Sequence, residues 1–292
     1  MLSRVFAVAC DAAYFRGLCA LLNSLWIYHR GDIPVFLYHR GLSEEQLAEI
    51  GGHPANPHLF AVPQLAFASA GMWEAKQQIF AHCIGRARCV FLLDADVVLL
   101  SAVYDVFELA ELGRIVSSAD GSGMTYDSHY AAYGHRLPGL RQPYVNTGAL
   151  CLDVVRHWDV AGLWAFSSQY GAYSPGAGAP LSLPGHGDQG LFNAIAALLG
   201  KEPDLHVLPA GPWCDSGEEC LVKIRRRYDD GRIDVWNLID DARQRLLHST
   251  GSKWWTPAGA AHLSWFCDKY ECFQYFAQWA KAERGAFNES VI

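Results

Sequence analysis

The run Val90-Phe-Leu-Leu-Asp94-Ala95-Asp96-Val-Val-Leu-Leu100 decides the fold, because two acidic residues interrupt a long apolar stretch. Buried carboxylates are costly unless they are paired or bind a metal. At the carboxyl end of a buried parallel strand they instead face the crevice where ligands bind. Side chains alternate along an extended chain, so Asp94 and Asp96 share one side. Such paired oxygen ligands suit Mn²⁺ or Mg²⁺ bridging phosphates, whereas a chance pair on a surface strand is the alternative.

Upstream of this run, strand-like and helix-like segments alternate. Strands are predicted over residues 5–9, 34–38, 59–62 and 89–93, and helices over residues 14–29, 43–50 and 72–84. Ser43 and Gln46 have the spacing of a capping box at the start of the second helix. Continuous apolar strands separated by helices indicate a parallel sheet covered on both faces. The first half therefore predicts an α/β fold with a Rossmann-like half.

The second half is more irregular. Strand character resumes over residues 145–152, and a helix is predicted over residues 188–199 with Asp188 as its cap. Residues 120–143 and 171–187, rich in Gly, are predicted to be long connections. Such loops are commonly lids or binding loops, and a disordered insertion is the alternative. An aromatic tail begins at Trp254 and is predicted to end in a helix over residues 270–284.

Composition excludes several classes of protein. Hydrophobic residues make up 51% of the chain, which argues against disorder. Net charge is −7, and the one basic run, residues 225–227, is interpreted as a solvated turn, so no nucleic-acid partner is expected. Nine cysteines form no Cys-x-x-Cys pair and are expected to be free, mostly buried thiols. No apolar stretch is as long as the about 18 residues needed to span a membrane. Asp11 ends the apolar N-terminal run, which is interpreted as a strand and not as a signal peptide, so we expect a cytoplasmic protein.

Five segments, taken in order, resemble glycosyltransferase family eight, the GT-A family that includes glycogenin and bacterial lipopolysaccharide galactosyltransferases. They are Ala7-Val-Ala9-Cys-Asp11-Ala-Ala-Tyr14-Phe-Arg-Gly17; Lys76; Asp94-Ala95-Asp96; Asn146-Thr-Gly148 with Ala149-Leu-Cys-Leu-Asp153; and Asp188-Gln189 with His248-Ser-Thr-Gly251-Ser-Lys253-Trp-Trp255. Each motif is short, and the resemblance rests on their order across most of the chain. One departure concerns the last segment. One residue separates Gly251 from Lys253 where the family usually has two, and Trp254 replaces a proline, which leaves Lys253 less firmly assigned than His248.

The resemblance implies a GT-A fold, a Rossmann-like mixed sheet flanked by helices, with a helical aromatic tail. It implies a catalytic domain over residues 1–253, divided into a nucleotide-binding half (1–120) and an acceptor half (121–253), and an extension over residues 254–292. It also implies a retaining hexosyltransferase that uses a UDP-sugar and Mn²⁺ or Mg²⁺. The acceptor is left open as a glycan, a lipid-linked molecule or a small molecule. The aromatic tail suggests peripheral contact with the inner face of a membrane.

The resemblance also implies a role for each matched residue. The implied metal ligands are Asp94, Asp96 and His248; the implied nucleotide-sugar contacts are Ala9, Asp11, Tyr14, Lys76, Asp94, Ala95, Gly148, Gly251 and Lys253; and the implied catalytic residues are Asn146, Asp188 and Gln189. Tyr14 could stack on uracil or simply pack at a helix start. Gly251 would let the backbone approach phosphate, and Lys253 would supply a point charge there.

Three other functions stay open. An aspartyl-phosphate phosphatase would use Asp94 as its nucleophile. A sugar nucleotidyltransferase would carry a Gly-rich basic loop near its start, which residues 7–17 lack. A non-catalytic sugar-nucleotide-binding protein could retain the same motifs.

Overall fold

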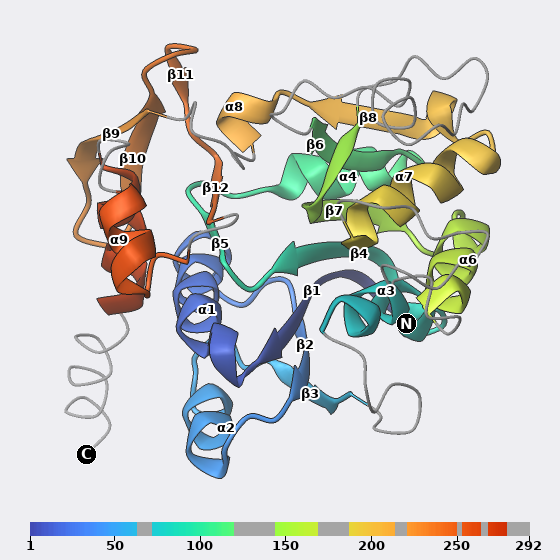
Figure 1. Ribbon diagram of the computed structural model, residues 1–292, viewed down its shortest axis with the longest axis horizontal. Coiled ribbons are helices and arrows are strands. Elements are labelled where there is room, and N and C mark those ends of the chain that lie inside the picture. Colours follow the sequence, from blue (N-terminus) through green and yellow to red (C-terminus); the bar gives the residue numbers. More distant parts are fainter. Residues whose placement is uncertain are drawn as a thin grey trace.

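The computed structural model of this 292-residue chain describes residues 1–62, 72–119, 144–168, 187–213, 221–249, 253–263 and 268–278. Its centre is a seven-stranded sheet with the order β3-β2-β1-β4-β7-β6-β8 (Figure 1). The strands are β1 (Leu2–Asp11), β2 (Val35–Arg40), β3 (His58–Ala61), β4 (Ala87–Asp94), β6 (Ile115–Ala119), β7 (Val145–Asp153) and β8 (Leu205–Leu208). The first four strands in the chain are mutually parallel, whereas β7 runs antiparallel to both of its neighbours, β4 and β6.

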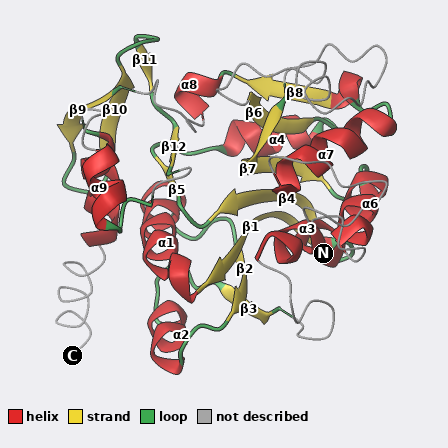
Figure 2. Ribbon diagram, viewed as in Figure 1, coloured by secondary structure: helices red, strands yellow, loops and turns green. Residues whose placement is uncertain are grey.

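Helices cover both faces of this sheet (Figure 2). On one face lie α1 (Phe15–His29), α2 (Glu44–Gly51) and α4 (Tyr104–Glu111), and on the other lie α3 (Met72–Cys83), α6 (Trp158–Ser168) and α7 (Gly187–Leu198). The other described helical segments are α8 (Ala210–Trp213), α9 (Pro257–Leu263), which lies beside β9 and β10, and residues 269–278. Alternation along β1 sends Phe6 and Val8 into the core beneath α1 and α4, and Val5 and Ala7 into the core beneath α3, α6 and α7.

The elements predicted from periodicity are present, with boundaries shifted by a few residues. The capping box is confirmed at α2, where the Ser43 hydroxyl accepts from the Gln46 N–H and the Gln46 side chain accepts from the Ser43 N–H. The parallel arrangement is confirmed for β3-β2-β1-β4, and the complete sheet is mixed.

Two smaller sheets complete the architecture. Strand β5 (Val97–Leu99) pairs with β12 (Leu246–His248), and β9 (Val222–Arg227), β10 (Ile233–Asn237) and β11 (Ala242–Arg243) form an antiparallel sheet. The prediction of a solvated turn at residues 225–227 is therefore wrong. These arginines end a strand because Val222 and Ile224 face the core behind them, and Arg225 stacks on Trp236 at 3.9 Å.

Several predictions fall on residues outside the described ranges: the connections over residues 120–143 and 171–186, Gly251, and the tail beyond residue 278. The division into domains likewise stays a prediction. Six cysteines lie in the described ranges, and none of these six forms a disulfide; Cys19 is half-buried and the others are buried. In the same ranges, no helix has the length and hydropathy required to cross a bilayer.

Candidate functional site

A cavity of about 300 Å³ lies where β1 and β4 end, at the carboxyl edge of the parallel strands. It is lined by Ala9, Cys10, Asp11, Tyr14, Met72, Lys76, Asp94, Ala95, Asp96, Asn146, Thr147, Gly148, Asp188, Gln189, His248 and Lys253. The structure thus brings together the predicted site residues, apart from Gly251, which lies outside the described ranges. They come from segments spread over almost the whole chain.

Three potential metal ligands converge on one side of the cavity. Asp94 ends β4, Asp96 precedes β5, and His248 ends β12. Pairing of β12 with β5 sets His248 opposite Val97, beside the two aspartates. Its Nε2 lies 3.2 Å from Oδ1 of Asp96 and 3.7 Å from Oδ2 of Asp94. One ligand atom from each residue lies within 4.8 Å of the others, which is close enough for a single cation to bind all three.

A glycine on β7 makes room for this histidine. A Cβ on Gly148 would lie 2.4 Å from Cε1 and 2.7 Å from Nδ1 of His248. The side-chain oxygen of Asn146 accepts a hydrogen bond from the Gly148 N–H at 2.6 Å, near the start of β7. The Asn146–Gly148 motif therefore shapes the ligand cluster as well as lining the cavity.

The two aspartates of the cluster differ electrostatically. Burial opposes ionisation of Asp96, but attraction to His248 and Lys253 outweighs it and lowers the pKa. The Lys253 ammonium lies 2.5 Å from Oδ2 of Asp96. For Asp94, burial outweighs the attraction of Lys76 and His248 and raises the pKa. The cluster thus holds one firmly ionised carboxylate and one that protonates more readily.

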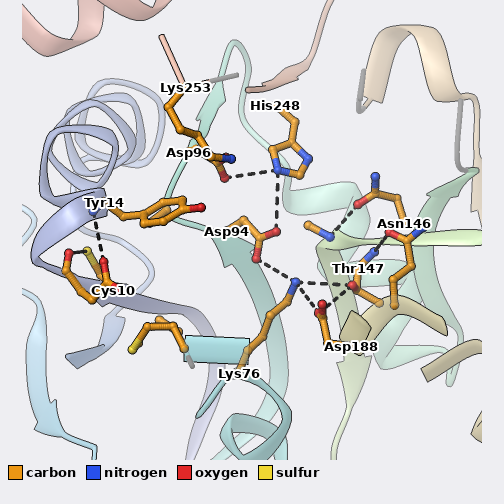
Figure 3. A pocket seen from close by; sticks show the side chains of 16 residues that line it. Cys10, Tyr14, Lys76, Asp94, Asp96, Asn146, Thr147, Asp188, His248 and Lys253 are labelled. Atoms are coloured by element: carbon orange, nitrogen blue, oxygen red, sulfur yellow. Dashed lines mark hydrogen bonds and ion pairs between the residues drawn. The ribbon is translucent and has the colours of Figure 1, made fainter. Parts of the chain in front are cut away.

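Lys76 joins the metal-ligand side of the cavity to its opposite wall (Figure 3). Its ammonium contacts Oδ1 of Asp94 and Oδ2 of Asp188, each at 2.8 Å, and donates to the Thr147 hydroxyl at 3.3 Å. Burial opposes the charge on Lys76, but attraction to Asp188 and Asp94 outweighs it and raises the pKa. Lys76 is therefore held charged within the wall.

The prediction that Asp188 caps its helix is wrong. Helix α7 begins at Gly187, so Asp188 lies in the first turn instead of before it. Its carboxylate accepts from Thr147 and Lys76. It is thus turned toward β7 and α3, beside the cavity.

The other end of the cavity is formed by the turn after β1. Oδ1 of Asp11 accepts from the N–H groups of Ala13 and Tyr14 and so caps a short 3₁₀ turn, Ala12–Tyr14. The Tyr14 ring packs edge-on against Trp255, and the Lys253 ammonium lies 5.1 Å from the ring centroid. Tyr14 therefore both packs at the helix start and lines the cavity, so its two predicted roles are compatible.

The motifs left three lining residues unassigned. Thr147 lies inside the Asn146–Gly148 motif, where a hydroxyl between two predicted site residues could have indicated a position in the cavity. Cys10 stands in the β1 motif, but a thiol in an apolar strand predicts only a core position. Met72 begins α3 and carries no signal of its own, because only the fold brings it to the cavity.

No protein-family model and no curated protein sequence matches this chain. Solved structures do match. The galactosyltransferase LgtC, in complex with donor and acceptor sugar analogs, has a TM-score of 0.63 at 16% identity, over 93% of this chain and 94% of that chain. The glycosyltransferase GlyE of Streptococcus pneumoniae TIGR4 has a TM-score of 0.54 at 15% identity, over 97% of this chain and 64% of that chain. The bifunctional glycosyltransferase WbbM has a TM-score of 0.56 at 11% identity, over 94% of this chain and 52% of that chain. The GT-A glycosyltransferase fold expected from the motifs is therefore confirmed.

Proposed function

We propose that this chain is a metal-dependent glycosyltransferase that moves a hexose from a UDP-sugar to an acceptor with retention at the anomeric carbon. The observation that supports it best is the convergence of Asp94, Asp96 and His248 in one cavity of a GT-A fold. The fold alone does not imply activity. The ligand cluster at the strand ends adds the chemistry that nucleotide-sugar transfer requires.

The residues present fit a divalent cation. Two carboxylates and one imidazole converge, and such oxygen and nitrogen donors suit Mn²⁺ or Mg²⁺. We propose that Asp94, Asp96 and His248 would hold the ion. When bound, it would supply positive charge that stabilises the leaving diphosphate.

The remaining lining residues divide by position. Ala9, Asp11, Tyr14 and Ala95 line the end formed by β1 and the β4–β5 turn, where we place the nucleoside. Lys253 would turn from Asp96 to the diphosphate, with Gly251 predicted beside it. We place the donor sugar in the remaining part, against Lys76, Asn146, Gly148, Asp188 and Gln189.

In the proposed reaction, the bond between the anomeric carbon and the diphosphate oxygen breaks, and its electron pair leaves with UDP. The acceptor oxygen bonds to the same face of that carbon, and the leaving oxygen takes the acceptor proton. Asp188 would stabilise the positive charge that builds on the sugar, since a fixed carboxylate needs no reorganisation. The acceptor stays open as a glycan, a lipid-linked molecule or a small molecule, as do a cytoplasmic location and membrane contact through the tail.

The alternatives have less support. An aspartyl-phosphate phosphatase normally carries its nucleophile after the first strand of its core domain, whereas Asp94 ends the fourth strand of this chain, β4. A sugar nucleotidyltransferase would need a Gly-rich basic loop after β1, and residues 7–17 do not form one. A protein that only binds a sugar nucleotide would not require all three potential metal ligands, whereas this chain keeps Asp94, Asp96 and His248.

The test is to incubate the protein with Mn²⁺ and a panel of UDP-sugars, with and without candidate acceptors, and to measure UDP release and sugar transfer. We expect UDP release from at least one donor and its loss on chelation. Proton NMR of the product gives the anomeric configuration. Absence of both UDP release and nucleotide-sugar binding across the panel would contradict the proposal.

A further inference from the structure

Thr147 is the middle residue of the Asn146–Gly148 motif, and neither the sequence motifs nor the proposed mechanism gives it a role. It lies on β7, is 1% exposed, and lines the cavity. Its neighbours in the motif have evident tasks, since the Asn146 side chain accepts from the Gly148 N–H and Gly148 makes room for His248. A buried hydroxyl at a cavity wall requires partners, and those partners indicate its function.

The hydrogen bonds of the Thr147 hydroxyl have fixed directions. A lysine ammonium can only donate, so the hydroxyl accepts from Lys76 at 3.3 Å. Its single proton is then donated to Oδ2 of Asp188 at 2.9 Å. The main-chain N–H of Thr147 donates to Oε1 of Gln189, the residue that follows Asp188, at 3.4 Å. Thr147 therefore contacts both residues of the Asp188-Gln189 pair.

The same contacts saturate Lys76. Its three N–H bonds have three acceptors, in Asp94, Asp188 and Thr147. Asp188 receives two donors on Oδ2, while its Oδ1 has no partner among the described residues. One oxygen of Asp188 is thus fixed by the wall of the cavity, and the other is left for a bound molecule.

We propose that Thr147 is a positioning residue of the transfer reaction: it holds Asp188 and Gln189 in register with the donor sugar by tying α7 to β7 and to Lys76. This inference rests on the proposed function and adds a residue to it. Thr147 does not touch the reacting atoms. It acts through Asp188, whose carboxylate would rotate about its remaining Lys76 contact without the hydroxyl.

This position predicts a specific kinetic effect. Removing a group that orients a functional side chain typically costs about tenfold to a hundredfold in activity. The hydrogen bonds of Thr147 go to Lys76, Asp188 and Gln189 and to none of the described nucleoside or metal residues, so UDP binding should be unaffected. A misoriented Asp188 should therefore reduce kcat while KM for the donor stays nearly constant.

The test compares Thr147→Val and Thr147→Ala, which lack the hydroxyl, with Thr147→Ser, which keeps it. Kinetics are measured as UDP release from the donor that the wild-type protein uses best, and Mn²⁺-dependent UDP binding is measured by calorimetry. Ser167→Ala is the matched control. It deletes a buried hydroxyl that donates to the Trp164 carbonyl in α6, away from the cavity.

We expect Thr147→Val and Thr147→Ala to lower kcat about tenfold or more, with UDP affinity unchanged, and Thr147→Ser to restore kcat to within about threefold of wild type. Ser167→Ala should keep wild-type kcat. Wild-type kcat in Thr147→Val would overturn the inference, as would a parallel fall in kcat and UDP affinity. Failure of both hydroxyl-free variants to fold, beside a folded Ser167→Ala, would also overturn it by showing a structural role. A wild-type protein that releases no UDP from any donor would instead refute the proposed function.

Discussion

Among the described residues that line the cavity, two lysines supply positive charge beside four aspartates, and the surroundings of the two lysines differ. Lys76 is buried, and its donors are used by Asp94, Asp188 and Thr147. Lys253 contacts Asp96 and the Ser249 carbonyl, and its side chain is 21% exposed. Lys76 is thus part of the wall, whereas Lys253 can exchange one anionic partner for another.

Asp96 is the aspartate whose loss should matter most. We predict that Asp96→Asn lowers turnover at least about a hundredfold, because several kcal/mol of transition-state stabilisation depend on a charged metal ligand. Calorimetry should show weaker Mn²⁺ binding, and circular dichroism should show an intact fold. Near-normal turnover in a folded variant would remove Asp96 from the metal site.

Lys253 offers a second test. We predict that Lys253→Ala lowers kcat more than it weakens donor binding, since a charge on the leaving group acts mainly in the transition state. Lys253→Arg should retain part of the activity because it keeps the charge. Steady-state kinetics and calorimetric titration of UDP separate the two effects. An unchanged kcat would mean that the diphosphate does not use Lys253.

Sequence reasoning predicted the residues of the site better than their connections. Asp94 and Asp96 could be predicted because two charges inside an apolar run have a cost that ion pairing or a bound ligand must offset. The bridge from Lys76 to Asp188 could not be predicted. Lys76 lies on α3 and Asp188 on α7, and no local pattern encodes which carboxylates a buried lysine meets.

The packing of β7 against β12 gives a prediction about a pair of strands. Gly148→Ala places a Cβ 2.4 Å from the His248 ring, so the ring must move. We predict that Mn²⁺ affinity falls about tenfold to a hundredfold, as for other groups that orient a metal ligand. Calorimetry with Mn²⁺ alone measures this effect. Gly162→Ala on α6 is the control, because a Cβ there meets no atom within 4 Å. Wild-type Mn²⁺ affinity in Gly148→Ala would exclude His248 as a ligand.

The end of β7 gives a prediction about pH. Oδ1 of Asp153 accepts from the N–H groups of Val155 and Arg156, and Oδ2 pairs with Arg88 at 2.8 Å. Burial opposes its charge, but these contacts outweigh burial and lower the pKa from 3.8. A lowered folded-state pKa stabilises the protein above the unfolded-state pKa, and this stability disappears as pH falls through the folded-state pKa.

We therefore predict that Asp153→Asn lowers the free energy of unfolding by about 1–3 kcal/mol at pH 7, the usual worth of hydrogen bonds to a charged group. The difference from wild type should narrow once pH falls below about 4. Urea unfolding of both proteins at several pH values measures it. A difference that stays constant down to the acid limit of folding would show that the charge of Asp153 is unimportant.

The elements that the sequence predicted share a strong local pattern, and those it missed do not. Helix α1 repeats leucines at helical spacing, and β4 is a continuous apolar run. Strand β9 exposes arginines, and β5 is three residues long, so each is recognisable only beside its partner. The direction of β7 was also hidden, because apolar content does not record whether a buried strand runs parallel or antiparallel.

The whole molecule keeps the GT-A fold of LgtC at 16% identity. Core positions require volume and apolarity more than identity, so most of them can change. Segments at β1, α3, β4 and β7, and the two parts of the last motif at α7 and β12, meet at one cavity, which is why five short motifs in order predicted the fold when each alone was weak.

From this arrangement we predict that donor binding depends on a metal ion. The cavity holds four aspartates against two lysines, and Lys76 is fully engaged by the wall, so a diphosphate would meet excess negative charge without a cation. We predict that UDP binds measurably with Mn²⁺ and at least about tenfold more weakly with chelator. A tenfold loss of affinity corresponds to about 1.4 kcal/mol of binding free energy. Calorimetric titration under both conditions measures it.

Thermal unfolding gives an independent readout. UDP at a hundred times its Kd with Mn²⁺ should add about 2.7 kcal/mol of stability, because a ligand that binds only the folded state stabilises it by mass action. For a chain of this size, that amounts to a rise of several degrees in Tm. Uridine, which lacks the diphosphate, is the control and should show little dependence on Mn²⁺. Asp96→Asn should lose the metal-dependent part of the shift. Equal UDP affinity with Mn²⁺ and with chelator would mean that Asp94, Asp96 and His248 do not mediate donor binding through a cation.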